Sequence, residues 1–271
     1  MASKAFTHLL KILRVLASVA ALLLLIIAII YQDRTAFVLH QMAVMLPQIL
    51  TGSMDASSFN GGFIINIAVS LSAMSIALVL GTLLGFLMTS EMAMVRTVCT
   101  LLMNLFRNSP WLVILYAMLY LLPFQVHIGG RELLFSPFLK ATIGLSLPII
   151  ANLAEIVRGS IQTVSAGQWE SARSLGYSSF QAFRIIILPQ AIPRMIPNFM
   201  TTYSMLFIGS SLIIVTGTND VLNVVKIIAS SQGDEIVSAL YILVLFLFFM
   251  YCYPIAICSR IYESRLRKDY S

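Results

Sequence analysis

Long apolar stretches alternate with short polar ones along the 271 residues of the chain. A helix needs about 20 mostly apolar residues to cross the hydrocarbon core of a bilayer, and six stretches reach that length. Strands of a membrane barrel would be about ten residues long and would alternate in polarity, whereas these stretches are continuous. The pattern therefore predicts an all-α integral membrane protein with about six transmembrane helices. The expected ranges are Ile12–Tyr31, Phe63–Thr89, about Val98–Leu122, Phe138–Gly159, about Met195–Gly217 and Ile236–Ser259.

The first stretch has two interpretations. Basic residues precede it, as they do in a secretory signal peptide. It is long for such a peptide, however, and bulky Ile29, Ile30 and Tyr31 stand where small residues would mark a cleavage site. We favour an uncleaved transmembrane helix.

Composition supports a membrane location. Of all residues 59% are hydrophobic and only 10% are charged, whereas a soluble domain carries about 25% charged residues. The net charge of +6 is compatible with nucleic-acid binding, but the basic residues gather at the ends of apolar stretches, which is the positive-inside pattern. With six crossings and a cytoplasmic N-terminus, all but four of the 17 basic residues lie in the cytoplasm; the four are Arg34, Arg131, Lys140 and Lys226. We expect a multi-pass protein of the bacterial inner membrane, in contact with lipid, with both termini cytoplasmic and no nucleic-acid partner.

The second stretch carries a small residue at every fourth position. Ala73, Ala77, Gly81 and Gly85 share one face of a helix, and small residues let two helix backbones approach closely. The stripe predicts a packing face, although Ala and Gly are common in membrane helices.

The sequence carries no recognisable enzyme site. Cys99, Cys252 and Cys258 have neither zinc-site nor disulfide-framework spacing, and no Ser/His/Asp set appears. A Gly-rich P-loop, which would cradle ATP, is missing as well. We expect that the chain is not an enzyme and binds no metal or cofactor itself.

The most unusual segment is the polar stretch Gln162–Pro189, between the fourth and fifth predicted helices. Trp169, Ala172 and Leu175 are spaced for one helix face, and Gly176 favours the left-handed conformation that ends helices. Ser178 or Ser179 can cap a second helix over Ala182–Ile187, which Pro189 would end. This helix–turn–helix either presents an apolar ridge to a groove on another protein or folds back on its own membrane domain, and the pattern leaves both open.

The spacing within this segment resembles the EAA loop of ABC importer permeases, whose consensus is E-A-A, three residues, G, nine residues and I-x-L-P. Only one of the two Ala residues departs, because Ser171 stands directly after Glu170. The matching positions are Glu170, Ser171, Ala172, Gly176, Ile186, Leu188 and Pro189. Two flanking segments, Ala154–Gly176 and Phe106–Val113, resemble the polar amino-acid subfamily, which includes histidine, arginine, glutamine and glutamate permeases.

This resemblance implies a fold and a function. It implies a five-helix type I importer core at residues 62–259, with a cytoplasmic coupling loop at 162–189. Residues 1–61 would add an N-terminal transmembrane helix and a periplasmic connection, and 260–271 would form a basic cytoplasmic tail. The implied function is the permease subunit of an ATP-driven importer, which translocates a polar amino acid. The implied partners are an ABC ATPase dimer that holds ATP and Mg, a second permease subunit, identical or homologous, and a periplasmic or lipid-anchored substrate-binding protein. Ile208 stands where the family usually has Lys, which weakens close substrate analogy.

Candidate residues for the substrate path or a gate lie in three helices. Glu155 and Arg158, three residues apart, can form an ion pair, and intramembrane ionisable groups are functional suspects. A structural ion pair, a helix boundary and helix packing are the corresponding alternatives. The candidates are Asn152, Glu155 and Arg158 in the fourth helix, Arg107 in the third, and Gly209, Ser210 and Ser211 in the fifth.

A stand-alone secondary transporter or channel for a small polar solute is the alternative function. It would need ion-coupling carboxylates at mid-membrane, often with inverted repeats. Glu155 is the single deeply placed carboxylate candidate in the sequence, and no convincing repeat appears.

Overall fold

The computed structural model describes residues 2–54, 59–128, 131–232 and 236–269. The chain folds into helices and one short β-hairpin, formed by β1 (Gln125–Ile128) and β2 (Arg131–Leu134). The helices are α1 (Ala2–Tyr31), α2 (Thr35–Thr51), α3 (Gly62–Leu87), α4 (Ala93–Arg107), α5 (Trp111–Leu121), α6 (Pro137–Gln162), α7 (Ala166–Ser174), α8 (Ser179–Ala182), α9 (Leu188–Gly209), α10 (Val221–Gln232) and α11 (Val237–Asp269).

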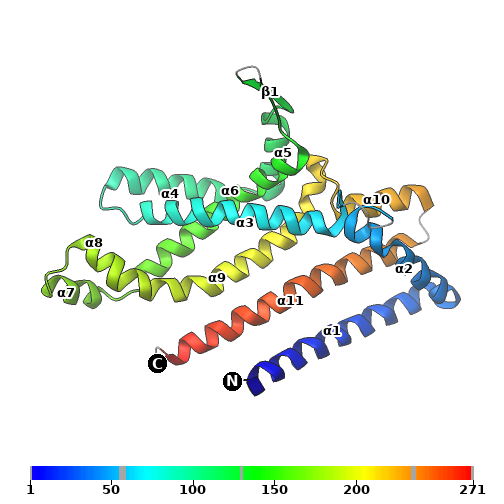
Figure 1. The fold of residues 1–271 in the computed structure, drawn as a ribbon, viewed down its shortest axis with the longest axis horizontal. Coiled ribbons are helices and arrows are strands. Elements are labelled where there is room, and N and C mark those ends of the chain that lie inside the picture. Colours follow the sequence, from blue (N-terminus) through cyan, green and yellow to red (C-terminus); the bar gives the residue numbers. More distant parts are fainter. Residues whose placement is uncertain (1, 55–58, 129–130, 233–235, 270–271) are drawn as a thin grey trace.

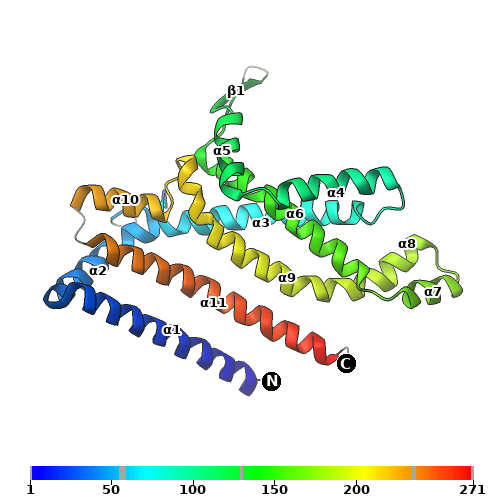
Figure 2. The same cartoon turned by 180° about the vertical axis from the view of Figure 1, so that it is seen from behind.

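The long helices cross the molecule between two ends. Both chain termini and the α7–α8 segment lie toward one end, and α2 and α10 lie toward the other (Figure 1). The same arrangement is visible from behind, where α1 and α11 again run side by side (Figure 2). Among the described residues, five helical segments are long and apolar enough to cross a membrane, and a bent pair would make a sixth. The predicted class, an all-α membrane protein with about six spans, is confirmed.

The third predicted crossing is not one straight helix. α4 and α5 meet at an angle of 99°, and the break falls between Asn108, which follows the last residue of α4, and Pro110, which precedes the first residue of α5. Proline has no backbone N–H, and it also pushes the residue before it out of the helical region. The polar interruption in the sequence was therefore a true helix end.

The β-hairpin follows α5 and was not predicted. Its strands are antiparallel, with Gln125 opposite Leu134, and it projects away from the helices (Figure 1). Lys140, at the start of α6, is fully buried behind it. The ammonium group donates hydrogen bonds to the carbonyl oxygens of Leu119 and Leu122, at 3.1 and 2.7 Å. It thereby satisfies carbonyls at the C-terminal end of α5, where a positive charge is favourable.

Two of the hydrophobic clusters among the described residues join most of the long helices. One joins α2, α10 and α11, and includes Phe63 of α3 and Phe207 of α9. The other joins α3, α6 and α9 around Leu145, Ile149 and Leu206. α1 contributes little to either, since Ile27 is its one residue among their buried members.

The small-residue stripe of α3 is a packing face, as predicted. Gly81 and Gly85 are buried against α6. A Cβ atom on Gly85 would lie 2.6 Å from the Cβ of Val157 and 2.7 Å from the carbonyl oxygen of Ala154. One on Gly81 would lie 2.8 Å from the Cβ of Leu153. The two helix backbones therefore approach so closely that no larger residue fits between them.

This contact generates a stability prediction. Gly85→Ala should destabilise the folded protein by about 1–3 kcal/mol, because overpacking forces neighbouring atoms apart. The measurement is the thermal midpoint of the purified protein in detergent. Gly159→Ala is the matched control, since a Cβ there meets no atom within 4 Å and alanine favours helix. Equal midpoints for the two variants would show that α3 and α6 do not need the glycine.

Candidate functional site

α7 ends in a glycine-dependent turn. Gly176 has a φ of +82°, which is the left-handed conformation predicted for it. Its N–H donates to the carbonyl of Arg173 at 2.9 Å, and the N–H of Tyr177 donates to that of Ala172 at 3.1 Å. These two bonds define a Schellman motif, which fixes the direction in which the chain leaves α7.

α8 begins with a capping box. The hydroxyl of Ser178 accepts the backbone N–H of Gln181 at 3.3 Å, and the side-chain oxygen of Gln181 accepts the N–H of Ser178 at 2.9 Å. The sequence left Ser178 and Ser179 as equal candidates for the cap. The structure assigns the role to Ser178.

The expected helix end at Pro189 is wrong. α8 continues through a π-helical turn, Phe183–Ile187, directly into α9. In that turn the N–H of Leu188 donates to the carbonyl of Phe183, five residues earlier. Pro189 stands in the first turn of α9, where a missing N–H costs no intrahelical hydrogen bond. The wide turn therefore lets proline sit inside a continuous helical segment.

The side chains of the apolar ridge predicted on α7 do not all face the same way. Ala172 is fully buried and Trp169 is half-buried, whereas Leu175 is 75% exposed. Trp169 packs with Ile187 of the π turn against Val157 and Ile161, on the last part of α6. The segment both folds back on its own membrane domain and presents a surface outward.

The outward surface combines polar and apolar side chains. Glu170, Ser171 and Pro189 are exposed. Leu175 lies at the end of α7, and Phe180 of α8 is 69% exposed. Ile186 and Leu188, two further residues predicted to couple the chain to an ATPase, are half-buried. These residues thus form one hairpin with an anchored face and a free face.

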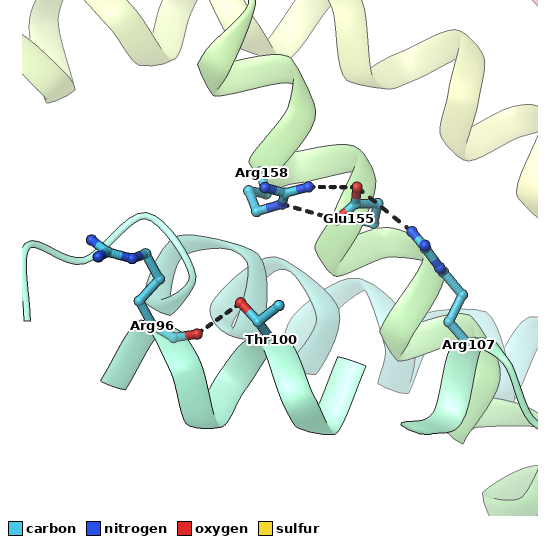
Figure 3. A network of polar contacts seen from close by, with 5 residues as sticks. All are labelled: Arg96, Thr100, Arg107, Glu155 and Arg158. Carbon is cyan, nitrogen blue, oxygen red and sulfur yellow. Dashed lines mark hydrogen bonds and ion pairs between the residues drawn. The ribbon is translucent and has the colours of Figure 1, made fainter. Parts of the chain in front are cut away.

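A second group of polar side chains joins α4 to α6. The carboxylate of Glu155 accepts two hydrogen bonds from the guanidinium of Arg158, at 2.9 and 2.7 Å. A nitrogen of Arg107, at the end of α4, lies 3.6 Å from the same carboxylate (Figure 3). The sequence suggested these residues separately, and the fold brings them together. Their side chains are 29–35% exposed, and Asn152, one turn earlier on α6, is half-buried.

The third predicted group, Gly209, Ser210 and Ser211, mainly makes packing contacts and local hydrogen bonds. A Cβ on Gly209 would collide with the ring of Trp111. Ser210 is fully buried, and its hydroxyl donates to the carbonyl of Phe207 at 2.7 Å. Ser211 is half-buried, and its hydroxyl donates to the carbonyl of Ile208 at 2.9 Å. Gly209 and Ser210 thus match the helix-packing alternative.

Sequence reasoning missed a buried polar network at the far end of α3. The amide nitrogen of Asn66 donates to the carbonyl and hydroxyl of Ser210, at 3.2 and 3.1 Å, and its oxygen accepts the N–H of Val221 at 3.0 Å. Asp220 caps α10 by accepting the N–H of Asn223 at 3.0 Å. Asn66 therefore ties α3 to the start of the 3-10 helix Ser210–Thr216 and to the start of α10. A single asparagine within an apolar stretch was the available signal.

Asp220 lies outside the membrane-spanning segments and is fully buried. Its second carboxylate oxygen has no hydrogen-bond partner among the described residues. Burial, which removes water from the carboxyl, raises its pKa from 3.8 to about 6, although the Asn223 N–H opposes the change.

The fold and these sites define a class of protein. Apolar helices that carry a polar, partly exposed hairpin at the end where both termini lie form a multi-pass membrane component. The chain belongs to the family "Binding-protein-dependent transport system inner membrane component", which matches residues 77–268. α1 and α2 precede the matched part.

Individual relatives agree with this family. The chain is 30% identical to "Probable amino-acid ABC transporter permease protein y4tF" of Sinorhizobium fredii, over 80% of this chain and 92% of that one. It is 33% identical to "Probable amino-acid ABC transporter permease protein YckA" of Bacillus subtilis, over 73% and 84%. It is 29% identical to the "Glutamate/glutamine/aspartate/asparagine transport system permease protein BztC" of Rhodobacter capsulatus, over 80% of this chain but only 49% of that protein.

Solved structures share the fold. The structure described as "Crystal structure of an amino acid ABC transporter with histidines" matches with a TM-score of 0.64 and 25% identity, over 75% of this chain and 92% of that one. The resemblance to ABC importer permeases is confirmed, and the chain is a multi-pass inner-membrane transport component. Nothing in the comparisons supports a stand-alone transporter.

The buried Asp220 generates a pH prediction. Its folded-state pKa of about 6 exceeds the unfolded value, so its contribution to stability is fully present below about pH 4 and is lost as the pH rises through about 6. Asp220→Asn keeps an acceptor for Asn223 but removes the charge. Its stability advantage over the parent should grow by about 1 kcal/mol between pH 5 and pH 7.5.

Thermal midpoints of parent and variant at the two pH values measure this difference. Asp33→Asn is the matched control, because it removes the same charge from an exposed side chain. The prediction fails if Asp220→Asn follows the pH dependence of the parent.

Proposed function

We propose that this chain is the translocation subunit through which an ATP-driven importer carries a polar amino acid into the cell. The observation that supports the proposal is the α7–α8 hairpin at one end of the bundle, on which Glu170 and Ser171 of the EAA-type residues are exposed. The family supports delivery by a substrate-binding protein, either periplasmic or lipid-anchored. The amino-acid substrate is supported by the names of y4tF and YckA.

The proposed division of labour follows from the surface of the hairpin. A dimer of ABC ATPases, which holds the ATP and Mg, would receive Glu170, Ser171 and the exposed side chains Leu175 and Phe180. A mixed surface of this kind suits a groove on another protein. A second permease subunit, identical or homologous, would complete the translocation path.

The hairpin is attached firmly enough to transmit a movement. The ring of Phe183 packs edge-on against Phe86 of α3, with centroids 5.7 Å apart. A guanidinium nitrogen of Arg194, on α9, donates to the carbonyl of Thr163, just after α6, at 3.0 Å. Displacement of the hairpin would therefore act on α3, α6 and α9 together rather than on a loose loop.

The ion-paired group is our candidate for a gate. Glu155 and Arg158 belong to α6, and Arg107 belongs to the end of α4. An angle change between α4 and α6 would break the 3.6 Å contact of Arg107 first, because Arg158 is held on the same helix as Glu155. Asn152 and Ser211 remain candidate path residues. The bend between α4 and α5 supports a gate position here.

We further propose that both termini and the hairpin lie in the cytoplasm. The support is the distribution of basic residues and the shared end of the molecule in Figure 1. An alkaline phosphatase fused after Ser271 should be inactive, and a fluorescent protein fused there should fold and be bright. Phosphatase activity at that position would reverse the orientation.

Gly176 gives the sharpest test of coupling. Gly176→Val should strain the turn by about 1–3 kcal/mol, because a β-branched residue is strongly disfavoured at positive φ. No neighbouring atom lies within 4 Å of a Cβ there, so the effect comes from the backbone and not from a collision. Retention of the ATPase by the purified permease should fall roughly tenfold or more, with membrane insertion unchanged.

Two variants separate coupling from general damage. Gly176→Asn should largely restore ATPase retention, because asparagine tolerates the left-handed conformation. Ser179→Ala should have little effect, since Ser178 forms the cap. Parental ATPase retention and transport in Gly176→Val would contradict the coupling role.

A further inference from the structure

A cavity of about 470 Å³ lies between α1 and α11, at the end of the bundle that holds both termini. It belongs to none of the sites described above. One half of its lining is cationic or polar and the other half is apolar. The lining residues are Lys11, Arg14, Val15, Tyr253, Ile257, Arg260, Ile261 and Ser264.

The cationic half has an excess of positive charge. Lys11, Arg14 and Arg260 are exposed. Glu155 forms ion pairs with Arg107 and Arg158, and among the described residues no ion pair joins Lys11, Arg14 or Arg260 to an acidic side chain. Three cations around one cavity favour an anionic ligand, and arginine binds phosphate oxygens in a bidentate manner.

The position of the cavity along the helices gives its depth in the membrane. From Lys11 to Tyr31 α1 rises about 30 Å, at about 1.5 Å per residue, which equals the thickness of the hydrocarbon core. The apolar part of α11 runs from Val237 to Ser259 and spans about the same distance. Arg260 and Lys11 therefore lie at the same boundary, where phospholipid headgroups are found.

The apolar half points to an amphiphile and not to a small soluble anion. Val15, Ile257 and Ile261 line the cavity beside the cations. A free phosphate ion has no apolar portion to place against them. A phospholipid has both parts, with its phosphate at headgroup depth and its acyl chains toward the bilayer centre.

We propose that this cavity binds the headgroup phosphate of an acidic phospholipid, which bridges α1 to α11. Basic pockets between transmembrane helices are suited to anionic lipid headgroups. α1 gains most from such a bridge, because Ile27 is the one buried side chain among its residues Leu10–Tyr31. Two of the three cations come from α1, which lies outside the part matched by the family, so the site is an addition of this N-terminal helix.

The test uses the full importer complex, purified in detergent and titrated with phosphatidylglycerol or phosphatidylcholine. Native mass spectrometry counts the bound lipid. The parent should bind phosphatidylglycerol in preference to phosphatidylcholine. Arg14→Gln/Arg260→Gln should bind phosphatidylglycerol about 30-fold more weakly, which corresponds to about 2 kcal/mol for two cations.

Three further variants sharpen the result. Lys226→Gln/Arg265→Gln removes two exposed cations that do not line the cavity and should bind like the parent. Ile257→Trp keeps every charge but fills the cavity, and it should also lose binding. Arg260→Gln alone leaves the N-terminal charges that orient α1, and it should bind about 5-fold more weakly.

Equal phosphatidylglycerol binding by Arg14→Gln/Arg260→Gln and its control would overturn the proposal. Displacement of the lipid by millimolar inorganic phosphate would overturn it as well, since the site would then be one for a soluble anion. Loss of the ATPase subunit with unchanged lipid binding would assign the cations to a protein partner instead.

Discussion

The close approach of α3 and α6 is the contact on which the rest of the structure depends. Gly81 and Gly85 let the two backbones meet, and α6 in turn carries Glu155 in its C-terminal half and the anchor of the hairpin at its end. Any residue that separated α3 from α6 would shift both sites at once. The close packing of α3 against α6 thus fixes the positions of Glu155 and of the polar hairpin, although these polar groups contribute little to the packing.

Two sets of contacts make the hairpin part of the membrane domain and not an appendage. Aromatic and aliphatic side chains hold its inner face against the end of α6, and α9 emerges from it without a break. Glu170 and Ser171 on its outer face are exposed. A short, exposed hairpin can therefore direct long helices, because its own conformation is fixed by the left-handed Gly176 and the capping box at Ser178.

Features with local causes could be predicted from the sequence, and features with distant causes could not. The apolar stretches, the small-residue stripe and the turn at Gly176 follow from residues close together in the chain. The contact between Arg107 and Glu155 joins residues far apart in sequence, as does the network of Asn66 and Asp220. Pro189 was misread because the wide turn before it depends on packing of Ile187 against α6. Spacing alone does not reveal such a turn.

The π-helical turn between α8 and α9 also sets a rotational phase. A π turn holds one residue more than an α turn, and each residue of an α-helix corresponds to about 100° of rotation. Phe183–Ile187 therefore turns the hairpin by about that angle relative to the face of α9 that enters the membrane. Loss of a single residue from this segment would leave both helices intact. It would, however, rotate the exposed face of the hairpin relative to the face of α9 that packs in the membrane domain. Chain length here is thus as strictly constrained as residue identity.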